Sequence, residues 1–144
     1  MDREDIYYSI NNEAHCEIKE KGSRFLGYIT PVKSEAEAAD AITAIQKKHH
    51  SATHHCTASI IGIQQHKRVS RFNDDGEPSG TAGRPILNAL ERDNLVNVLC
   101  VVTRYFGGVK LGTGGLARAY GKAASFTVRT AGIEKRYIRE SLGV

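Results

Sequence analysis

The sequence predicts an α+β fold, a two-layer α/β sandwich in which helices cover one face of a mostly antiparallel sheet. Strand and helix patterns follow one another in the order strand, strand, helix, strand, loop, helix, strand, helix. The first two strand patterns are joined by a short turn, which indicates an antiparallel hairpin. A hairpin and single strands separated by helices are typical of two packed layers around one core.

The length of 144 residues predicts one domain, 1–144, with a core at about 14–131 and a polar, basic tail at 132–144. The three cysteines form no C-x-x-C pair, and an odd count without a signal peptide favours the reducing cytoplasm. The longest apolar run, Leu95 to Thr103, is too short to span a bilayer, so no membrane partner is expected.

The first half of the chain shows a hairpin followed by a helix. Residues 1–12 are polar and mixed, and we expect a frayed start that adds at most a short edge segment. Alternation predicts strands over 14–19 and 24–32, with a turn at 20–23. Ser34 and Glu37 then form a capping box, which predicts a helix to about His50.

The second half contains two glycine-rich loops, each leading into a helix. A near-continuous apolar strand follows the helix of the first loop and precedes the second loop. We expect this strand at the centre of the sheet. The expected elements are strand 53–63, short strand 69–72, first glycine loop 73–83, helix from Pro85 to about 94, strand 95–106, second glycine loop 107–115 and helix 116–131.

The glycine loops are the most specific feature of the sequence. Eight of the fourteen glycines lie between Gly76 and Gly115. Glycine is favoured where φ is positive or where the backbone approaches another group closely. The loops are therefore either tight turns or a surface on which backbone amides at a helix start hold an anion.

The charge distribution favours a polyanionic partner. Residues 1–99 hold 12 Lys/Arg and 14 Asp/Glu, whereas residues 100–144 hold 8 Lys/Arg and 2 Asp/Glu. On the final helix, Arg118, Lys122, Ser125 and Arg129 fall at helical spacing on one stripe. This basic region is typical of RNA binding or of contact with an acidic protein surface, and the alternative is a solvated face without a partner.

Gly112 to Ala117 fits G-x-G-x-x-A after a strand and before a helix. A dinucleotide-binding fold also needs a second parallel strand that carries an acidic residue, and Glu134 lies instead in a polar tail. There is no G-x-x-x-x-G-K-[ST], which excludes a P-loop. Free amides at the helix start, near Lys110 and Arg104, could still hold a phosphate or carboxylate.

Asp74, Asp75 and Glu77 form an acidic cluster in the first loop. Such residues usually cap the segment that follows, and the alternatives are a Mg²⁺ site or pairing with arginines of the second loop. The histidines near residues 49–55 have no metal-ligand spacing, so a helix-end cap and strand residues are favoured. Cys56 and Cys100 are interpreted as buried small apolar residues.

Two long segments resemble the signature segments of the IMPACT/YigZ family. They are D-D-G-E-P-S-G-T-A-G-R-P (Asp74 to Pro85) and V-V-T-R-Y-F-G-G-V-K-L-G-T-G-G-L-A-R-A-Y (Val101 to Tyr120). K-E-K-G-S-R-F-L-G-Y (Lys19 to Tyr28) is similar to the first hairpin of that family. The resemblance extends from about Ala14 to Ala131 and corresponds to the family's N-terminal domain.

The resemblance implies a fold like the second domain of ribosomal small-subunit protein five, which also occurs in a family of small-molecule kinases. Eukaryotic relatives regulate translation under amino-acid starvation, and nucleic-acid binding has been proposed for bacterial relatives. The resemblance therefore implies a cytoplasmic, translation-linked domain whose partner is RNA, a ribosome-associated component or a translation-regulatory protein.

The first functional hypothesis is a non-enzymatic domain that binds RNA without a cofactor. The second is a Mg²⁺-dependent enzyme or binder for a phosphorylated small molecule or nucleotide, which would use Asp74, Asp75 and Glu77. The third is a protein-interaction module with an exposed apolar patch. The residues expected to contact an anion or nucleic acid are Arg71, Arg84, Arg104, Lys110, Gly112, Thr113, Gly114, Gly115, Arg118 and Lys122.

Overall fold

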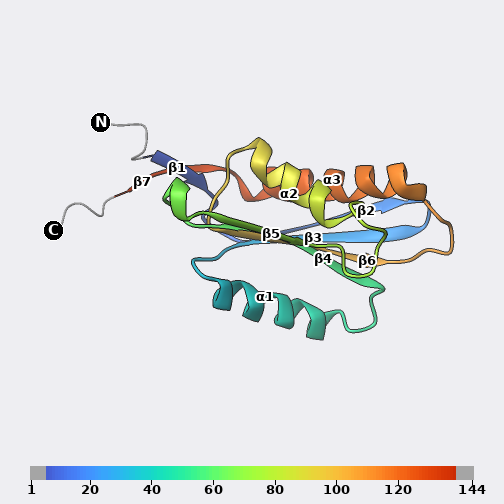
Figure 1. The fold of residues 1–144 in the computed structure, drawn as a ribbon. Coiled ribbons are helices and arrows are strands. Elements are labelled where there is room, and N and C mark those ends of the chain that lie inside the picture. The colour runs from blue at the N-terminus through green and yellow to red at the C-terminus, as the bar shows by residue number, and fades with distance from the viewer. Residues whose placement is uncertain (1–5, 139–144) are drawn as a thin grey trace.

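The computed structural model describes residues 6–138 and consists of a five-stranded antiparallel sheet, a separate two-stranded ribbon and three α-helices (Figure 1). The elements are β1 (Ile6–Ser9), β2 (Ala14–Glu20), β3 (Ser23–Pro31), α1 (Glu35–Lys48), β4 (His54–Ile61), the short 3-10 helix η2 (Gln65–Lys67), β5 (Val69–Asn73), α2 (Gly83–Arg92), β6 (Val98–Tyr105), α3 (Gly112–Ala131) and β7 (Glu134–Tyr137). The α+β class and the antiparallel sheet are confirmed.

The large sheet has the strand order β2-β3-β6-β4-β5, and every neighbouring pair is antiparallel. β6 is the central strand, as its apolar run predicts, and Val102 pairs with Gly27 of β3 and with Cys56 of β4. The hairpin of β2 and β3 is also confirmed, with Cys16 opposite Gly27.

The helices lie on both faces of the sheet, which differs from the expected two-layer arrangement. α2 and α3 cover one face and α1 crosses the other (Figure 1). The reason is visible in β6, where Val98, Cys100 and Val102 join the core beneath α2 and α3, whereas Leu99 and Val101 pack on the α1 side. A strand that is apolar on both faces needs cover from both sides.

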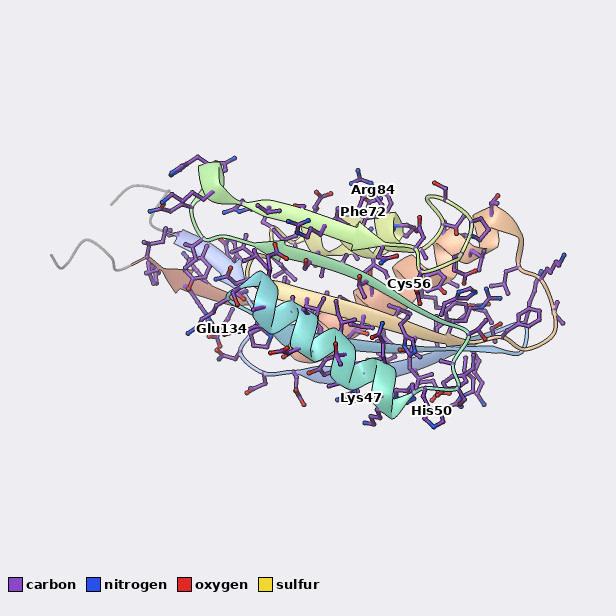
Figure 2. All side chains as sticks on the ribbon, turned by 60° about the horizontal axis from the view of Figure 1, so that its bottom comes forward. Lys47, His50, Cys56, Phe72, Arg84 and Glu134 are labelled. Carbon is purple, nitrogen blue, oxygen red and sulfur yellow. The ribbon has the colours of Figure 1, made fainter. Side chains whose placement is uncertain are left out.

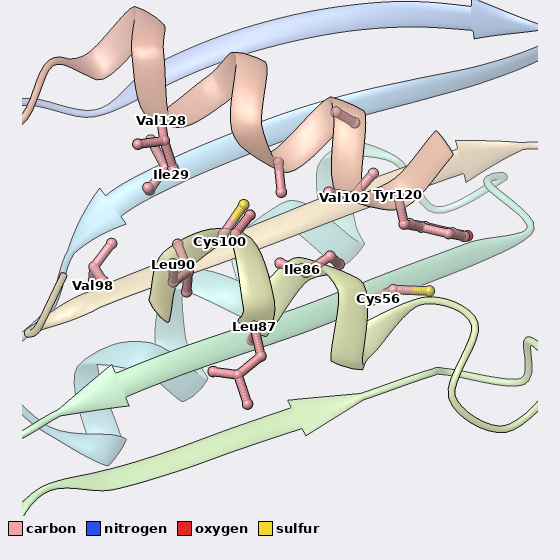
Figure 3. Close-up of a cluster of buried hydrophobic side chains, with 14 of the residues drawn as sticks. Ile29, Cys56, Ile86, Leu87, Leu90, Val98, Cys100, Val102, Tyr120 and Val128 are labelled. Carbon is pink, nitrogen blue, oxygen red and sulfur yellow. The ribbon is translucent and has the colours of Figure 1, made fainter. Parts of the chain in front are cut away.

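The larger core lies between the sheet and helices α2 and α3 (Figure 3). Phe25, Ile86 and Tyr120 are fully buried there, and the rings of Phe25 and Tyr120 meet edge to face at 5.1 Å between centroids. Gly27 allows α3 to lie directly on β3, because a Cβ at this position would be 2.0 Å from Thr127 Oγ1. This close approach fixes α3 over the hairpin.

Several element boundaries differ from the sequence expectation. β6 begins at Val98 and not at Leu95, because Leu95 bridges to Tyr8 and Asn97 has a positive φ of 57°. α3 begins at Gly112 and not at Leu116, so the glycines at the end of the second loop form the first helical turn.

The β1–β7 ribbon joins segments from opposite ends of the chain, with Ile6 opposite Tyr137. Each strand has four residues, which is too short for a reliable alternating pattern. The rest of the expected frayed start and tail, residues 1–5 and 139–144, lies outside the described residues.

The Ser34 cap at the start of α1 is confirmed, whereas Glu37 reaches one residue further back than the capping box predicts. Ser34 Oγ accepts from the Glu37 amide at 3.1 Å, and the Glu37 carboxylate reaches back to the Lys33 amide at 2.8 Å. Within residues 6–138, no helix has the length and apolar character needed to cross a membrane.

Candidate nucleic-acid interface

The first glycine loop is held inward by Asp74. Its carboxylate accepts from the backbone amides of Gly80 at 2.9 Å, Ala82 at 3.1 Å and Gly83 at 2.7 Å. Burial alone would raise the pKa of Asp74, but these three amides lower it below the ordinary value of 3.8. Asp74 therefore caps the start of α2, where Ala82 in the N-cap position provides no side-chain cap of its own.

The loop is also fastened to β4. Asp75 Oδ2 accepts from the His55 amide at 2.7 Å, and His54 Nδ1 donates to the Asp75 carbonyl at 2.8 Å. Cys56 Sγ donates to the Asp74 carbonyl at 3.2 Å, and burial raises the pKa of this thiol to about 12. The interpretation of the histidines as strand residues and of Cys56 as a buried residue agrees with these contacts.

Glu77 is the only acidic residue within residues 6–138 that is buried. Arg104 Nη1 donates to Glu77 Oε2 at 2.7 Å, and the Tyr120 hydroxyl donates to the same oxygen at 2.5 Å. Both Glu77 and Arg104 are buried, and burial raises the pKa of Tyr120 well above its usual range. His54 Nε2 approaches the other Glu77 oxygen at 3.4 Å.

Arg104 connects this cluster to the second loop. Its Nε and Nη2 donate to Ser23 Oγ at 3.3 and 3.2 Å, and that hydroxyl also accepts from the Gly107 amide at 3.1 Å. Gly107 lies directly against Gly22, because a Cβ on Gly107 would be 2.0 Å from the Gly22 carbonyl carbon. The acidic loop therefore meets the arginine that precedes the second glycine loop, by way of one buried ion pair.

The acidic cluster does not fit a Mg²⁺ site. Asp74 is occupied by helix amides, Asp75 by the His55 amide, and Glu77 by Arg104 and Tyr120. Within residues 6–138, no three His, Cys, Asp or Glu side chains are placed to hold a metal ion. Mg²⁺ needs carboxylates that are free to coordinate it together with water, and these three are committed elsewhere.

The second loop and the start of α3 face outward. Gly112, Thr113 and Gly114 are exposed, and no side chain in the described part of the chain caps the helix start. Lys110 and Arg118 are exposed beside these amides, and neither forms an ion pair within residues 6–138. The first turn contains no acidic residue, so the positive end of the helix dipole is not offset there.

A sequence model of the Impact N-terminal domain matches residues 21–128. The chain belongs to the Impact N-terminal domain family. Its two signature-like segments, Asp74 to Pro85 and Val101 to Tyr120, are the segments joined by the Glu77–Arg104 pair and by Tyr120.

Among its relatives, the IMPACT family member YvyE of Bacillus subtilis is 45% identical over 130 residues, which cover 90% of this chain and 59% of that protein. An IMPACT family member of Thermus thermophilus is 48% identical over 109 residues, which cover 76% of this chain and 56% of that protein. The crystal structure of a hypothetical protein superposes with a TM-score of 0.87 at 31% identity, over 92% of this chain and 65% of that one. The chain thus spans a little more than half the length of these curated relatives.

The structure of this Impact N-terminal domain separates the expected anion-binding residues into two groups. The first group surrounds the exposed start of α3 or follows it along the helix. It consists of Lys110, the turn from Gly112 to Gly115, Arg118 and Lys122. Lys122 Nζ lies 3.3 Å from Glu20 Oε1, and both side chains are exposed. An exposed pair of this kind is weak and leaves the cation available to solvent and ligands.

Arg71, Arg84 and Arg104 are not part of that surface. Arg71 lies on the edge strand β5 and pairs with Glu35 of α1 at 3.1 Å. Arg84, on α2, stacks over Phe72 of β5 (Figure 2) at 5.1 Å from its ring centroid. Arg104 is buried and committed to Glu77 and Ser23.

Sequence reasoning missed two exposed apolar residues in the second loop. Phe106 and Val109 are 49% and 50% exposed, next to the start of α3. Their exposure could have been predicted from the sequence, because both residues follow the end of the central strand. They lie in a glycine-rich loop, where no core position is expected. They add an exposed aromatic ring and an exposed aliphatic side chain to the loop that carries Lys110.

Proposed function

We propose that this domain binds RNA, or an RNA-containing component of the translation apparatus, through the exposed start of α3 and the loop before it. The observation that carries this proposal is the uncapped first turn, Gly112 to Gly115, flanked by the exposed cations Lys110 and Arg118. Backbone amides and a helix dipole at such a turn favour an anionic group, and a phosphate of the RNA backbone supplies one.

The charge of this region supports the same partner. Residues 100–144 hold 8 Lys/Arg and 2 Asp/Glu, and Lys122 and Arg129 continue the exposed basic stripe along α3 from Arg118. A row of exposed cations binds successive phosphates and releases their counterions. We assign the anion contacts to Lys110, Arg118, Lys122 and the amides of the first turn.

The exposed loop residues favour RNA over a simple anion. Phe106 provides a ring on which a base can stack, and unpaired RNA bases are commonly recognised on aromatic side chains. This proposal agrees with the translation-linked role that the family resemblance implies. It requires no catalytic group and no metal.

The test is a fluorescence anisotropy titration of a labelled RNA hairpin with single-stranded flanks, at about 50 and 200 mM salt. We expect binding that weakens steeply with salt for the wild-type protein. Arg118→Ala combined with Lys122→Ala should weaken binding and reduce the slope of log affinity against log salt by about 2, since each lost phosphate contact lowers it by about 1.

The matched control is Lys33→Ala combined with Lys67→Ala, which removes the same charge from exposed positions outside α3 and the second loop, in η2 and between β3 and α1. Its salt slope should remain that of the wild type. Absence of binding at low salt, or equal losses in the two double variants, would overturn the proposed surface.

A further inference from the structure

Helix α1 leaves part of its sheet face uncovered. Beneath the helix this face is apolar, with Leu99 and Val101 fully buried. Toward the hairpin of β2 and β3, the same face carries His15 and Tyr28 next to a cavity of about 280 Å³. The cavity lies between the end of α1 and the hairpin, and His49 and Thr103 also line it.

This open face is lined with flat, unsaturated rings. His15 and Tyr28 are cross-strand partners, and their ring centroids are 4.8 Å apart with an interplanar angle of 36°. His49 packs edge to face on Tyr105, and its Nδ1 lies 2.8 Å from the Tyr105 hydroxyl. The side chain of His15 is 55% exposed, so the outer ring of the pair is open to a ligand.

The rings are held in place before any ligand arrives. The Tyr28 hydroxyl donates to Glu13 Oε2 at 2.8 Å, and His55 Nδ1 lies 3.1 Å from Thr103 Oγ1. Burial, followed by the positive charge of Lys48, lowers the pKa of His49. Ordered rings lose little conformational entropy when a planar group stacks on them.

The remaining groups favour a planar ligand such as a base. Leu26 and Ile45 give the cavity an apolar floor, and Arg24 lies over the Tyr105 ring at 5.3 Å from its centroid. Arg24 also pairs with Glu17 at 2.9 Å, which keeps its guanidinium near the rim. A volume of about 280 Å³ is just below the range for small-molecule sites, about 300–1,000 Å³, and suits one base at a time.

The open face and the start of α3 lie on opposite faces of the sheet and meet only around its end, where β6 leads into the second loop. Tyr105 is the last residue of β6, Phe106 follows it, and Gly107 lies against Gly22 in the turn of the hairpin. A strand that stacks on His15 and Tyr28 therefore passes Tyr105 and Phe106 before its backbone reaches Lys110 and the first turn of α3. Since α3 covers the opposite face from α1 (Figure 1), a strand that contacts both surfaces wraps around the end of the sheet at the β2–β3 turn.

We propose that the sheet face left open by α1 stacks unpaired nucleobases, so that the domain selects single-stranded over double-stranded RNA. This inference rests on the proposed function and adds a base-reading surface to its phosphate-binding one. Aromatic rings on an exposed sheet recognise single-stranded RNA by stacking, whereas paired bases are inaccessible to them.

The first experiment uses the wild-type chain. Anisotropy titrations compare a labelled 12-nucleotide single strand with a blunt duplex of the same sequence, and adenosine monophosphate is added as a competitor. We expect the single strand to bind at least tenfold more tightly than the duplex, and the mononucleotide to compete only weakly. Equal affinity for strand and duplex would overturn the inference, and so would a mononucleotide that binds as tightly as the strand.

The second experiment locates the contact without relying on a variant. Single strands containing 4-thiouridine are crosslinked to the wild-type chain, and the modified peptides are identified by mass spectrometry. We expect crosslinks in residues 14–28 or at Tyr105 and Phe106. Crosslinks confined to α3 would overturn the stacking surface and leave the proposed function intact.

The third experiment replaces the outer ring pair. His15→Ala combined with Tyr28→Leu should weaken single-strand binding about tenfold or more, because stacking on an aromatic contributes a factor of this order for each base. Duplex affinity and the salt slope should not change, since no cation is lost. The matched control is His66→Ala with Tyr137→Leu, which alters exposed rings outside this face and should bind as the wild type does.

The two proposals fail in different ways. If no RNA binds at low salt, the proposed function fails and the inference fails with it. If RNA binds and the Arg118→Ala, Lys122→Ala variant loses affinity while the His15→Ala, Tyr28→Leu variant does not, only the inference fails. Circular dichroism and thermal unfolding of each variant confirm that it is folded.

Discussion

The two glycine loops look alike in sequence, but they differ in structure. The first, Asn73 to Gly83, turns its carboxylates inward, where helix amides, Arg104 and Tyr120 satisfy them. The second, Gly107 to Gly115, exposes its amides and is flanked by exposed Lys110 and Arg118. Glycine density alone therefore does not identify a binding loop; what distinguishes the two is whether the polar groups already have partners.

The largest expected difference between the loops concerns Glu77. Glu77→Ala leaves Arg104 buried without its carboxylate, which should lower the free energy of unfolding by about 3–5 kcal/mol. Lys110→Ala in the second loop should change it by less than about 0.5 kcal/mol, because Lys110 is exposed and forms no ion pair within residues 6–138. Urea unfolding followed by circular dichroism measures both values.

Replacing both Glu77 and Arg104 separates the cost of a buried, unpaired charge from the cost of lost packing. Glu77→Leu combined with Arg104→Met should recover a large part of the stability lost in Glu77→Ala, since no charge then remains buried and unpaired. Similar losses in Glu77→Ala and in the exposed control Glu91→Ala would show that the first loop is not held by this pair.

The second expected difference concerns the glycine at the start of each helix. Gly83 opens α2, and a Cβ there would be 2.8 Å from the Asn73 amide nitrogen and 2.9 Å from Phe72 Cδ1. Backbone atoms cannot move aside easily, so Gly83→Ala should destabilise the fold by about 1–3 kcal/mol. Thermal unfolding at fixed pH measures the loss, and a melting temperature equal to that of the wild type would contradict it.

Much of the fold is predictable because it depends on local periodicity. The hairpin, the Ser34 cap of α1, and the central position of β6 were all predicted from patterns within a few residues. The second helical layer was missed, although the apolar run in β6 already implies cover on both faces. The β1–β7 ribbon was missed because it joins short segments from opposite ends of the chain.

The candidate site was predictable only in part. The exposed stripe on α3 follows from helical spacing and was predicted. The burial of Arg104 was not, although its alternation with Val98, Cys100 and Val102 in β6 places it on the same covered face. Its pairing with Glu77, at a separation of 27 residues, depends on how the loop folds back over β4 and has no local signal.

The third prediction concerns the Asp74 cap of the first loop. Asp74→Ala removes the acceptor for three amides at the start of α2 and should cost about 1–2 kcal/mol at pH 6. Because the folded pKa of Asp74 lies below 3.8, its stabilisation is complete above that pH and is lost as the pH falls through the folded pKa. The difference in the free energy of unfolding between wild type and Asp74→Ala should therefore become smaller below about pH 3.8.

Urea unfolding at pH 6 and at about pH 3 checks this dependence. The control Asp40→Ala alters an exposed aspartate of α1 and should leave stability within about 0.5 kcal/mol at pH 6. A gap between Asp74→Ala and wild type that stays constant from pH 6 to 3 would mean that the carboxylate does not act as a charged cap.

The smallest expected effect has the opposite sign and comes from the second loop. Gly114 lies in the first turn of α3, and a Cβ there would meet only the tip of the Arg118 side chain, at 3.3 Å. Alanine restricts the unfolded chain more than glycine does, so Gly114→Ala should stabilise the fold by up to about 1 kcal/mol. Gly112→Ala, two residues earlier, should instead destabilise it by about 1–2 kcal/mol, because Gly112 has a φ of 77°.

Comparison of Gly114→Ala with Gly83→Ala tests whether the second loop is free of the packing constraints that fix the first loop. If Gly114→Ala stabilises the fold while Gly83→Ala destabilises it, packing does not require glycine at position 114. The remaining explanation for Gly114 is close approach of a ligand to the backbone amides of this turn. Anisotropy with the RNA hairpin then separates the two explanations. A Gly114→Ala variant that is more stable and yet binds RNA more weakly would assign Gly114 to close approach of the ligand, whereas unchanged binding would place the contact on Lys110, Arg118 and Lys122 alone.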